Sequence, residues 1–131
     1  HEATRWLEQA AADLKAAGDS RNAGNHEWAC FPCQQAGEKA LKAVWINDGH
    51  DPWGHSLLRL LEEHPDETHR GRLAPLRDAA SLLDKLYIPT RYPNGLPDLT
   101  PSKVYGEPDA IAALAAAARF IKLAREQLTA S

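Results

Sequence analysis

The sequence is poor in the features that are typical of secreted proteins, of membrane-spanning proteins and of proteins that bind nucleic acid through a large positive charge. It has only two cysteines among 131 residues, which excludes a fold that depends on several disulfides. No signal peptide and no long apolar run is present, so we expect a cytoplasmic, reduced protein without a membrane contact. The formal net charge of −3 argues against bulk binding of nucleic acid, although local basic patches are compatible with it.

The length of the chain bounds its organisation. A chain of 131 residues fits one domain, which we place at residues 1–131. Such a chain buries about two-thirds of its unfolded surface, so it needs neither a disulfide nor a metal in order to fold. No internal repeat is evident, and nothing in the composition implies a cofactor.

The residue pattern predicts an all-α fold. Alanine and leucine dominate, β-branched residues are few, and no stretch alternates between apolar and polar residues. We expect Gly18 and Gly49 to end the first two helices, and Pro108 suits the first turn of the last one. The predicted helices cover about Thr4–Ala17, Asn25–Asn47, Trp53–His64, Arg70–Tyr87 and Pro108–Leu128, with a long proline-rich loop before the last.

The second predicted helix carries a row of polar residues between two large aromatic ones. Gln35, Glu38 and Lys42 recur at helical spacing between Phe31 and Trp45. The row is either a solvated strip or a covered one, at a pocket or a subunit interface. A covered charge needs a partner, and Asp13 in the first helix is a candidate for Lys39 or Lys42. On another face the small side chains of Ala29, Cys33, Ala36, Ala40 and Ala43 allow a neighbouring helix to approach closely.

The Cys30-Phe31-Pro32-Cys33 segment has the spacing of a thiol oxidoreductase motif. That chemistry needs the first cysteine at a helix N-terminus after a strand, and this pair falls inside a helical pattern. His26 could share a face with both cysteines. Three ligands from one helix cannot close a tetrahedral zinc site, so we expect buried apolar thiols and no metal.

Two histidines have alternative roles. Arg59 and His64 lie five residues apart. They could act together, with Arg59 in contact with a phosphate and His64 as a general base, or they could belong to a solvated helix face that ends before Pro65. His55, at the start of the third predicted helix, either has a capping role or packs against the second helix, or it titrates near an anion site.

The segment from Tyr87 to Gly106 contains four prolines, which lower the entropy cost of ordering a long loop. Arg91 and Tyr92 lie in its middle. Arg91 either meets a phosphate or carboxylate, with Tyr92 stacked on a flat ligand or a partner, or it ties the loop to Asp84 or Glu38.

Taken together, these stretches resemble the HEPN domain family (higher eukaryotes and prokaryotes nucleotide-binding) over nearly the whole chain. The most specific motifs are Gln-Gln-x-x-Glu-Lys-Ala-Leu-Lys at residues 34–42 and Tyr-Ile-x-x-Arg-Tyr-Pro at residues 87–93. Trp6 with Asp13-Leu14, Ala29-Cys30-Phe31 and Gly54-His55-Ser56-Leu57 complete the resemblance. Pro32 departs from the family pattern, and so does Gly54, which stands where a threonine or serine often caps the short helix.

The resemblance implies an up-and-down bundle of four to five helices that dimerises. It also implies binding of a nucleotide or of a small nucleotidyltransferase partner, in some members as a toxin and antitoxin. A ribonuclease branch uses an arginine followed four to six residues later by a histidine, after the helix that corresponds to the fourth one here. Arg91 occupies that place and no histidine follows it, so the resemblance implies the non-nucleolytic branch and a protein that is not an enzyme by itself.

We therefore expect a binding site on the second helix and the proline-rich loop. Lys39 and Lys42 would supply positive charge, Arg91 would hold a phosphate, and Tyr92 would cover a base. The supporting residues would be Gln35, Glu38, His55 and Asp13. The alternatives are a metal-independent ribonuclease that uses Arg59 and His64, and a purely structural module in which Gln35, Glu38, Lys42 and Arg91 form an internal or interface network.

Overall fold

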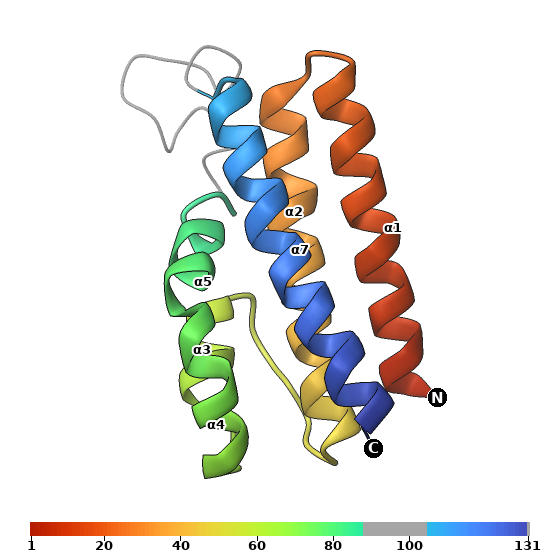
Figure 1. Ribbon diagram of the computed structural model, residues 1–131, viewed down its shortest axis with the longest axis vertical. Coiled ribbons are helices and arrows are strands. Elements are labelled where there is room, and N and C mark those ends of the chain that lie inside the picture. The colour runs from red at the N-terminus through yellow and green to blue at the C-terminus, as the bar shows by residue number, and fades with distance from the viewer. Residues whose placement is uncertain (88–104, 131) are drawn as a thin grey trace.

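The computed structural model describes residues 1–87 and 105–130, and every regular element in these two ranges is a helix (Figure 1). The long helices α1, α2 and α7 lie side by side, and the shorter helices cover one side of them. The all-α prediction is confirmed, and no helix among these residues is long and apolar enough to cross a membrane. The helices are α1 (Glu2–Asn22), α2 (His26–Asn47), α3 (Leu57–Glu62), α4 (Glu67–Leu73), α5 (Arg77–Asp84) and α7 (Glu107–Ala130), with a 3₁₀ turn, η1 (Ala74–Leu76), between α4 and α5.

Helix α1 is longer than predicted because Gly18 does not end it. The helix continues to Asn22, and Gly24, with a φ of 83°, makes the left-handed turn instead. The Gly24 and Asn25 amides donate to the carbonyls of Arg21 and Ser20, which are the two bonds of a Schellman motif. Gly49 ends α2 in the same way, as predicted, with a φ of 84°.

Helix α3 begins later than predicted. Gly54 does not cap it but adopts a φ of 81° in the turn that precedes it. Ser56 is the N-cap, and its hydroxyl accepts a hydrogen bond from the Arg59 amide at 3.2 Å. The missed signal was the serine two residues after the glycine.

The predicted fourth helix, Arg70–Tyr87, is divided into α4, η1 and α5. Pro75 interrupts it, because proline has no amide hydrogen to donate to the preceding turn. The helical stretch also begins earlier, at Glu67, where the Asp66 side chain caps the amides of Thr68 and His69. Its last regular residue is Asp84, so the chain reaches Tyr87 through a turn.

Helix α2 lies at the centre of the packing, in contact with α1, α7, α3 and α5. Its stripe of small side chains is almost completely buried, as predicted. Gly37 lies where α2 meets three neighbours, close to Leu57, Leu83 and Phe120. The buried face of α2 thus brings its polar row against the turn before α3 and against α1, and this contact builds the site described next.

Candidate functional site

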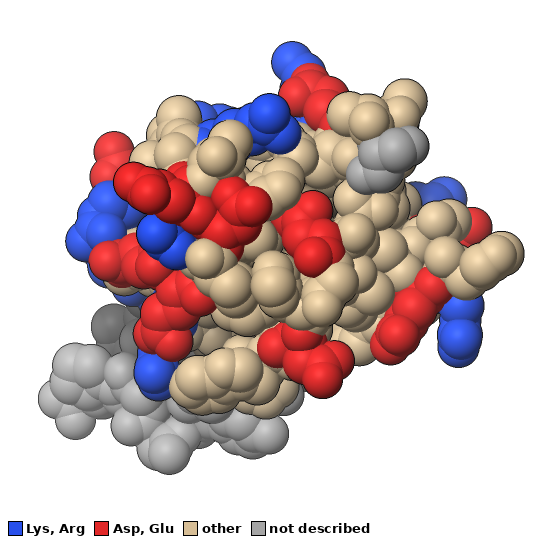
Figure 2. Space-filling view, turned by 90° about the horizontal axis from the view of Figure 1, so that it is seen from below, with Lys and Arg blue, Asp and Glu red and all other residues tan. Residues whose placement is uncertain are grey.

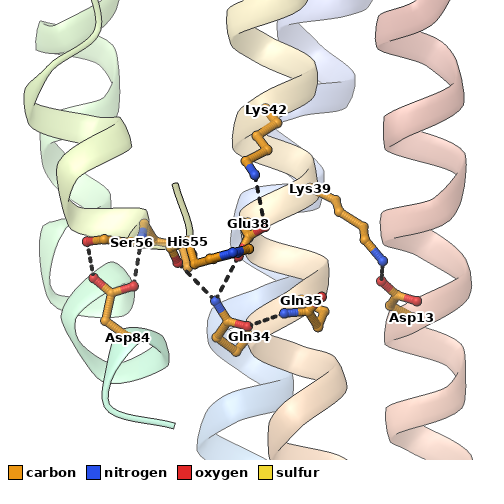
Figure 3. Close-up of polar contacts among 10 residues, drawn as sticks. Asp13, Gln34, Gln35, Glu38, Lys39, Lys42, His55, Ser56 and Asp84 are labelled. Carbon is orange, nitrogen blue, oxygen red and sulfur yellow. Dashed lines mark hydrogen bonds and ion pairs between the residues drawn. The ribbon is translucent and has the colours of Figure 1, made fainter. Parts of the chain in front are cut away.

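The centre of the polar row is the Glu38 carboxylate, which is buried, with 4% of the residue exposed. Its Oε2 accepts from Lys42 Nζ at 3.1 Å, and its Oε1 accepts from Gln34 Nε2 at 3.2 Å and lies 3.1 Å from His55 Nδ1 (Figure 3). A carboxylate withdrawn from water needs such partners. The row is therefore covered, which decides between the two alternatives that the sequence left open. We call Gln34, Gln35, Glu38, Lys42 and His55 the Glu38 network.

Gln34 holds the turn before α3 against α2. It is fully buried, and its amide nitrogen also donates to the His55 carbonyl at 3.1 Å. Its side-chain oxygen accepts from Gln35 Nε2 at 2.6 Å, which places Gln35 at the edge of the network as a supporting residue. Sequence reasoning missed Gln34, although it lies one helical turn before Glu38.

Both predicted lysines already face a carboxylate. Lys42 is 8% exposed and lies between Glu38 and the Trp6 ring, with its Nζ 5.6 Å from the ring centroid. Lys39 pairs with Asp13 at 2.6 Å, so Asp13 serves Lys39 rather than Lys42. This pair links α2 to α1 (Figure 3). Neither lysine therefore offers an unbalanced positive charge, and their binding of a ligand remains a prediction.

His55 is the accessible member of the Glu38 network. Its side chain is 62% exposed, and its ring stacks on Tyr87 at 5.1 Å between centroids and 17° between planes. Tyr87 in turn lies 6.3 Å from the Phe31 ring. Sequence reasoning missed Tyr87 as a member of the site. Arg91 and Tyr92 follow it after a few residues, and they lie outside the described residues.

Asp84 fixes the position of His55 indirectly, because it holds the start of α3. Its carboxylate accepts from the Leu57 and Leu58 amides at 2.7 and 3.1 Å and from the Ser56 hydroxyl at 2.8 Å. The two carboxylates suggested as tethers for Arg91, Asp84 and Glu38, thus both have several partners within residues 1–87.

Arg59 and His64 do not form one site. His64 is fully buried; its Nδ1 accepts the Asp66 amide at 3.0 Å, so its proton is on Nε2, which donates to Asp48 at 2.9 Å. Burial lowers the pKa of His64 below its ordinary 6.5.

The Arg59 side chain points away from His64, to Glu63 at 2.9 Å and over the Trp53 ring at 4.8 Å. The solvated-face interpretation is correct for Arg59 and wrong for His64, and the geometry gives no support to a ribonuclease that uses this pair.

The cysteines lie inside α2, as predicted, as free and fully buried thiols. Burial raises the pKa of Cys30 and of Cys33 to about 12, so neither is a thiolate near neutral pH. Within residues 1–87 and 105–130, no group of three or more histidine, cysteine or acidic side chains is placed to hold a metal ion.

An open hollow of about 560 Å³ is lined by the first turns of α1 and by Lys39 of α2. Arg5 and Lys39 bring positive charge to it, Glu2 and Glu8 bring negative charge, and Trp6 and Gln9 complete the lining. Because the two signs of charge are mixed, the hollow does not have the character of a phosphate site.

The sequence matches the HEPN domain family over residues 3–127. Three solved structures are similar to it. TT1696 from Thermus thermophilus is 40% identical with a TM-score of 0.89, over 96% of this chain and 98% of that one. ST0689, an archaeal HEPN homologue, is 33% identical with a TM-score of 0.80, over 96% and 97%. A HEPN domain protein from Thermotoga maritima, tm0613, is 29% identical with a TM-score of 0.70, over 95% and 98%. No curated protein matches the chain. The family match over nearly the whole sequence, together with the shared bundle, shows that the chain belongs to the HEPN domain family.

Proposed function

We propose that this HEPN chain is a dimeric binding module, and not an enzyme by itself, that binds a nucleotide or a small nucleotidyltransferase partner. The observation that carries the proposal is the Glu38 network. Its buried carboxylate orients the exposed His55 at the position where the chain leads into the segment that contains Arg91. A side chain that binds a ligand needs supporting hydrogen bonds to fix its orientation, and the Glu38 network supplies such support to His55.

The described contacts favour different roles for the predicted residues. Lys39 and Lys42 are balanced by Asp13 and Glu38, so they act mainly as supports: Lys39 ties α2 to α1, and Lys42 neutralises the Glu38 carboxylate within α2. Contact with a phosphate then depends on Arg91 and on His55, whose ring the Glu38 carboxylate orients. Tyr92 supplies the stacking surface for a base.

Isothermal titration calorimetry with ATP and other nucleotides tests this proposal. We expect saturable binding to the wild type that weakens about tenfold in Arg91→Ala, because a charge-assisted hydrogen bond is lost. Arg125→Ala is the matched control, since Arg125 is exposed on α7 and takes no part in the Glu38 network.

A pull-down with a small nucleotidyltransferase tests the protein partner, and light scattering tests the dimer. The absence of heat for every nucleotide, with an unchanged pull-down by Arg91→Ala, would contradict the site.

A purely structural module is the second candidate, and the ion pairs of Lys39 and Lys42 favour it. In that case the Glu38 network only holds α1, α2 and the turn before α3 together. His55→Ala separates the two functions, because His55 is exposed and its loss leaves the pair between Glu38 and Lys42 intact. A structural module predicts unchanged nucleotide and partner binding in this variant, whereas a binding site predicts weaker binding with little change in stability.

A further inference from the structure

A second hollow, of about 260 Å³, lies between α4 with η1 on one side and the C-terminal half of α7 on the other. Three of the side chains that line it are cationic: Arg72 from α4, and Arg119 and Lys122, one turn apart on α7. Only Glu126 brings negative charge to it. The hollow shares no residue with the Glu38 network, and positive charge prevails in it although the whole chain is negative.

These three cations differ from most others in the described part of the chain. Arg72 donates from Nη1 to the Gln127 side-chain oxygen, and Arg119 donates from Nη2 to the Pro75 carbonyl, both at 3.3 Å. Both acceptors are neutral, so they orient the guanidinium groups without balancing their charge. Lys122 has no hydrogen bond or ion pair to any residue within 1–87 and 105–130. By contrast Lys39, Lys42 and Arg59 each face a carboxylate, and so does Arg77, which pairs with Glu62 at 3.2 Å.

We infer that this hollow is an anion site for a compact phosphate group, such as a free phosphate or pyrophosphate or the phosphate tail of a small molecule. Each guanidinium uses one N–H on a neutral acceptor and keeps further donors in the planar arrangement that matches a phosphate oxygen pair. Lys122 adds a mobile point charge on the same face of α7.

The charge around the hollow favours a small ligand over a long polyanion. Figure 2 shows the end of the molecule where α1 begins and α7 ends, and acidic side chains are spread over it in several groups, with basic side chains among them and along its edges. A nucleic acid strand that left the hollow across this end would meet them, and the net charge of −3 would add to the repulsion. A phosphate or pyrophosphate group contacts only the hollow itself.

Calorimetric titration of the full chain with pyrophosphate at low ionic strength tests the inference. We expect saturable binding of one pyrophosphate per chain. The affinity should fall about tenfold in Lys122→Gln and about tenfold in Arg119→Gln, because each single change removes a charged contact. Arg125→Gln is the matched control: it makes the same change in net charge, on the same helix, outside the hollow, and we expect less than about a twofold effect. Lys122 is exposed and makes no hydrogen bond or ion pair among the described residues, so we expect its variant to keep the fold, and a thermal melt verifies this.

The outcomes separate this site from the proposed function. Pyrophosphate affinity that stays unchanged in Arg91→Ala supports an independent site, whatever nucleotide binding does in that variant. No saturable binding to the wild type would overturn the inference, and so would an equal loss in Arg125→Gln, which would indicate diffuse attraction. A single-stranded decanucleotide that binds more tightly than pyrophosphate, and does so through Lys122, would overturn the assignment to a compact ligand.

Discussion

Three other side chains interact with the Glu38 carboxylate. It neutralises the buried Lys42, accepts a hydrogen bond from the side-chain amide of Gln34, and lies against the exposed ring of His55. A buried ion pair stabilises a fold little more than a well-packed apolar pair would, but removing one of its partners is strongly destabilising. The pair is therefore better evidence that α2 and its neighbours are held in one arrangement than that the fold is unusually stable. The effect of removing one partner should therefore be large.

Glu38→Gln should lower the free energy of unfolding by about 3–5 kcal/mol, because it leaves the Lys42 ammonium buried without a counter-charge. Urea unfolding followed by circular dichroism measures the loss. Glu63→Gln is the matched control, since it removes the exposed partner of Arg59 and should cost less than about 1 kcal/mol. Equal effects of the two variants would contradict the role assigned to Glu38.

His64 should make the fold sensitive to acid. Burial lowers its folded pKa below 6.5, which approximates the unfolded value, so neither state binds a proton there well above pH 6.5. As the pH falls below 6.5, the unfolded state takes up a proton first, and the free energy of unfolding should fall by up to about 1.4 kcal/mol per pH unit, until the pH reaches the lowered folded pKa. Urea unfolding between pH 7.5 and 5 measures this slope.

The control for that slope is His64→Gln, which removes the titrating ring and leaves the neighbouring His50, His69 and Asp48 in place. The variant should be less stable at pH 7.5, because it loses the buried hydrogen bond between the His64 ring and Asp48. Its free energy of unfolding should nevertheless vary less with pH. A slope that is the same in both proteins would show that other groups cause the acid sensitivity.

Among the elements, α3 depends most on a residue far from it in sequence. It has six residues, too few to be stable alone, and Asp84 at the end of α5 accepts its first two amides. Asp84→Asn should therefore lower the free energy of unfolding by about 1–2 kcal/mol and reduce hydrogen-exchange protection at Leu57 and Leu58 first. Asp66→Asn, which changes the cap of α4, should leave these two amides unaffected. An undiminished protection of α3 in Asp84→Asn would contradict the capping role.

Local signals in the sequence predicted some element boundaries and missed others. The glycine that ends α2 and the proline that opens α7 act within one helical turn, and both predictions are confirmed. The prediction that Gly18 ends α1 is wrong, because a glycine inside a helix and one beyond it look alike in sequence, and of these two glycines only Gly24 takes the left-handed conformation. The start of α3 depends on Asp84, some 27 residues away from Leu57, which no local pattern reveals.

At the scale of the whole molecule, the sequence predicted residues of the candidate site on α2 but not what covers them. Helical spacing placed Glu38 and Lys42 in one row and gave Asp13 as a partner from α1, which the structure assigns to Lys39. It did not indicate that the turn before α3 would close over Gln34, or that Tyr87 would stack on His55. These contacts arise from the packing of α3 and α5 on α2, which is a property of the fold and not of a local pattern.

Gly37 has the closest neighbours of the glycines in the described part of the chain. A Cβ atom there would lie 2.7 Å from Leu57 Cδ2, 2.8 Å from Leu83 Cδ1 and 3.4 Å from Phe120 Cδ2, so the Leu57 side chain on α3 and the Leu83 side chain on α5 would have to shift. The first two atoms end flexible side chains, so Gly37→Ala should cost about 1–3 kcal/mol from overpacking, partly offset by the higher helix propensity of alanine.

Gly18→Ala provides the matched comparison for Gly37→Ala in thermal unfolding. Gly18 also lies inside a helix, but a Cβ atom there would have no neighbour within 4 Å, so only the propensity gain of up to about 1 kcal/mol remains. The melting temperature should therefore rise in Gly18→Ala and fall in Gly37→Ala. A rise in both would mean that α3 and α5 can move away from α2 at little cost. The turn that carries His55 would then not be held rigidly over Glu38, and the candidate site would lose the preorganisation on which the proposed binding depends.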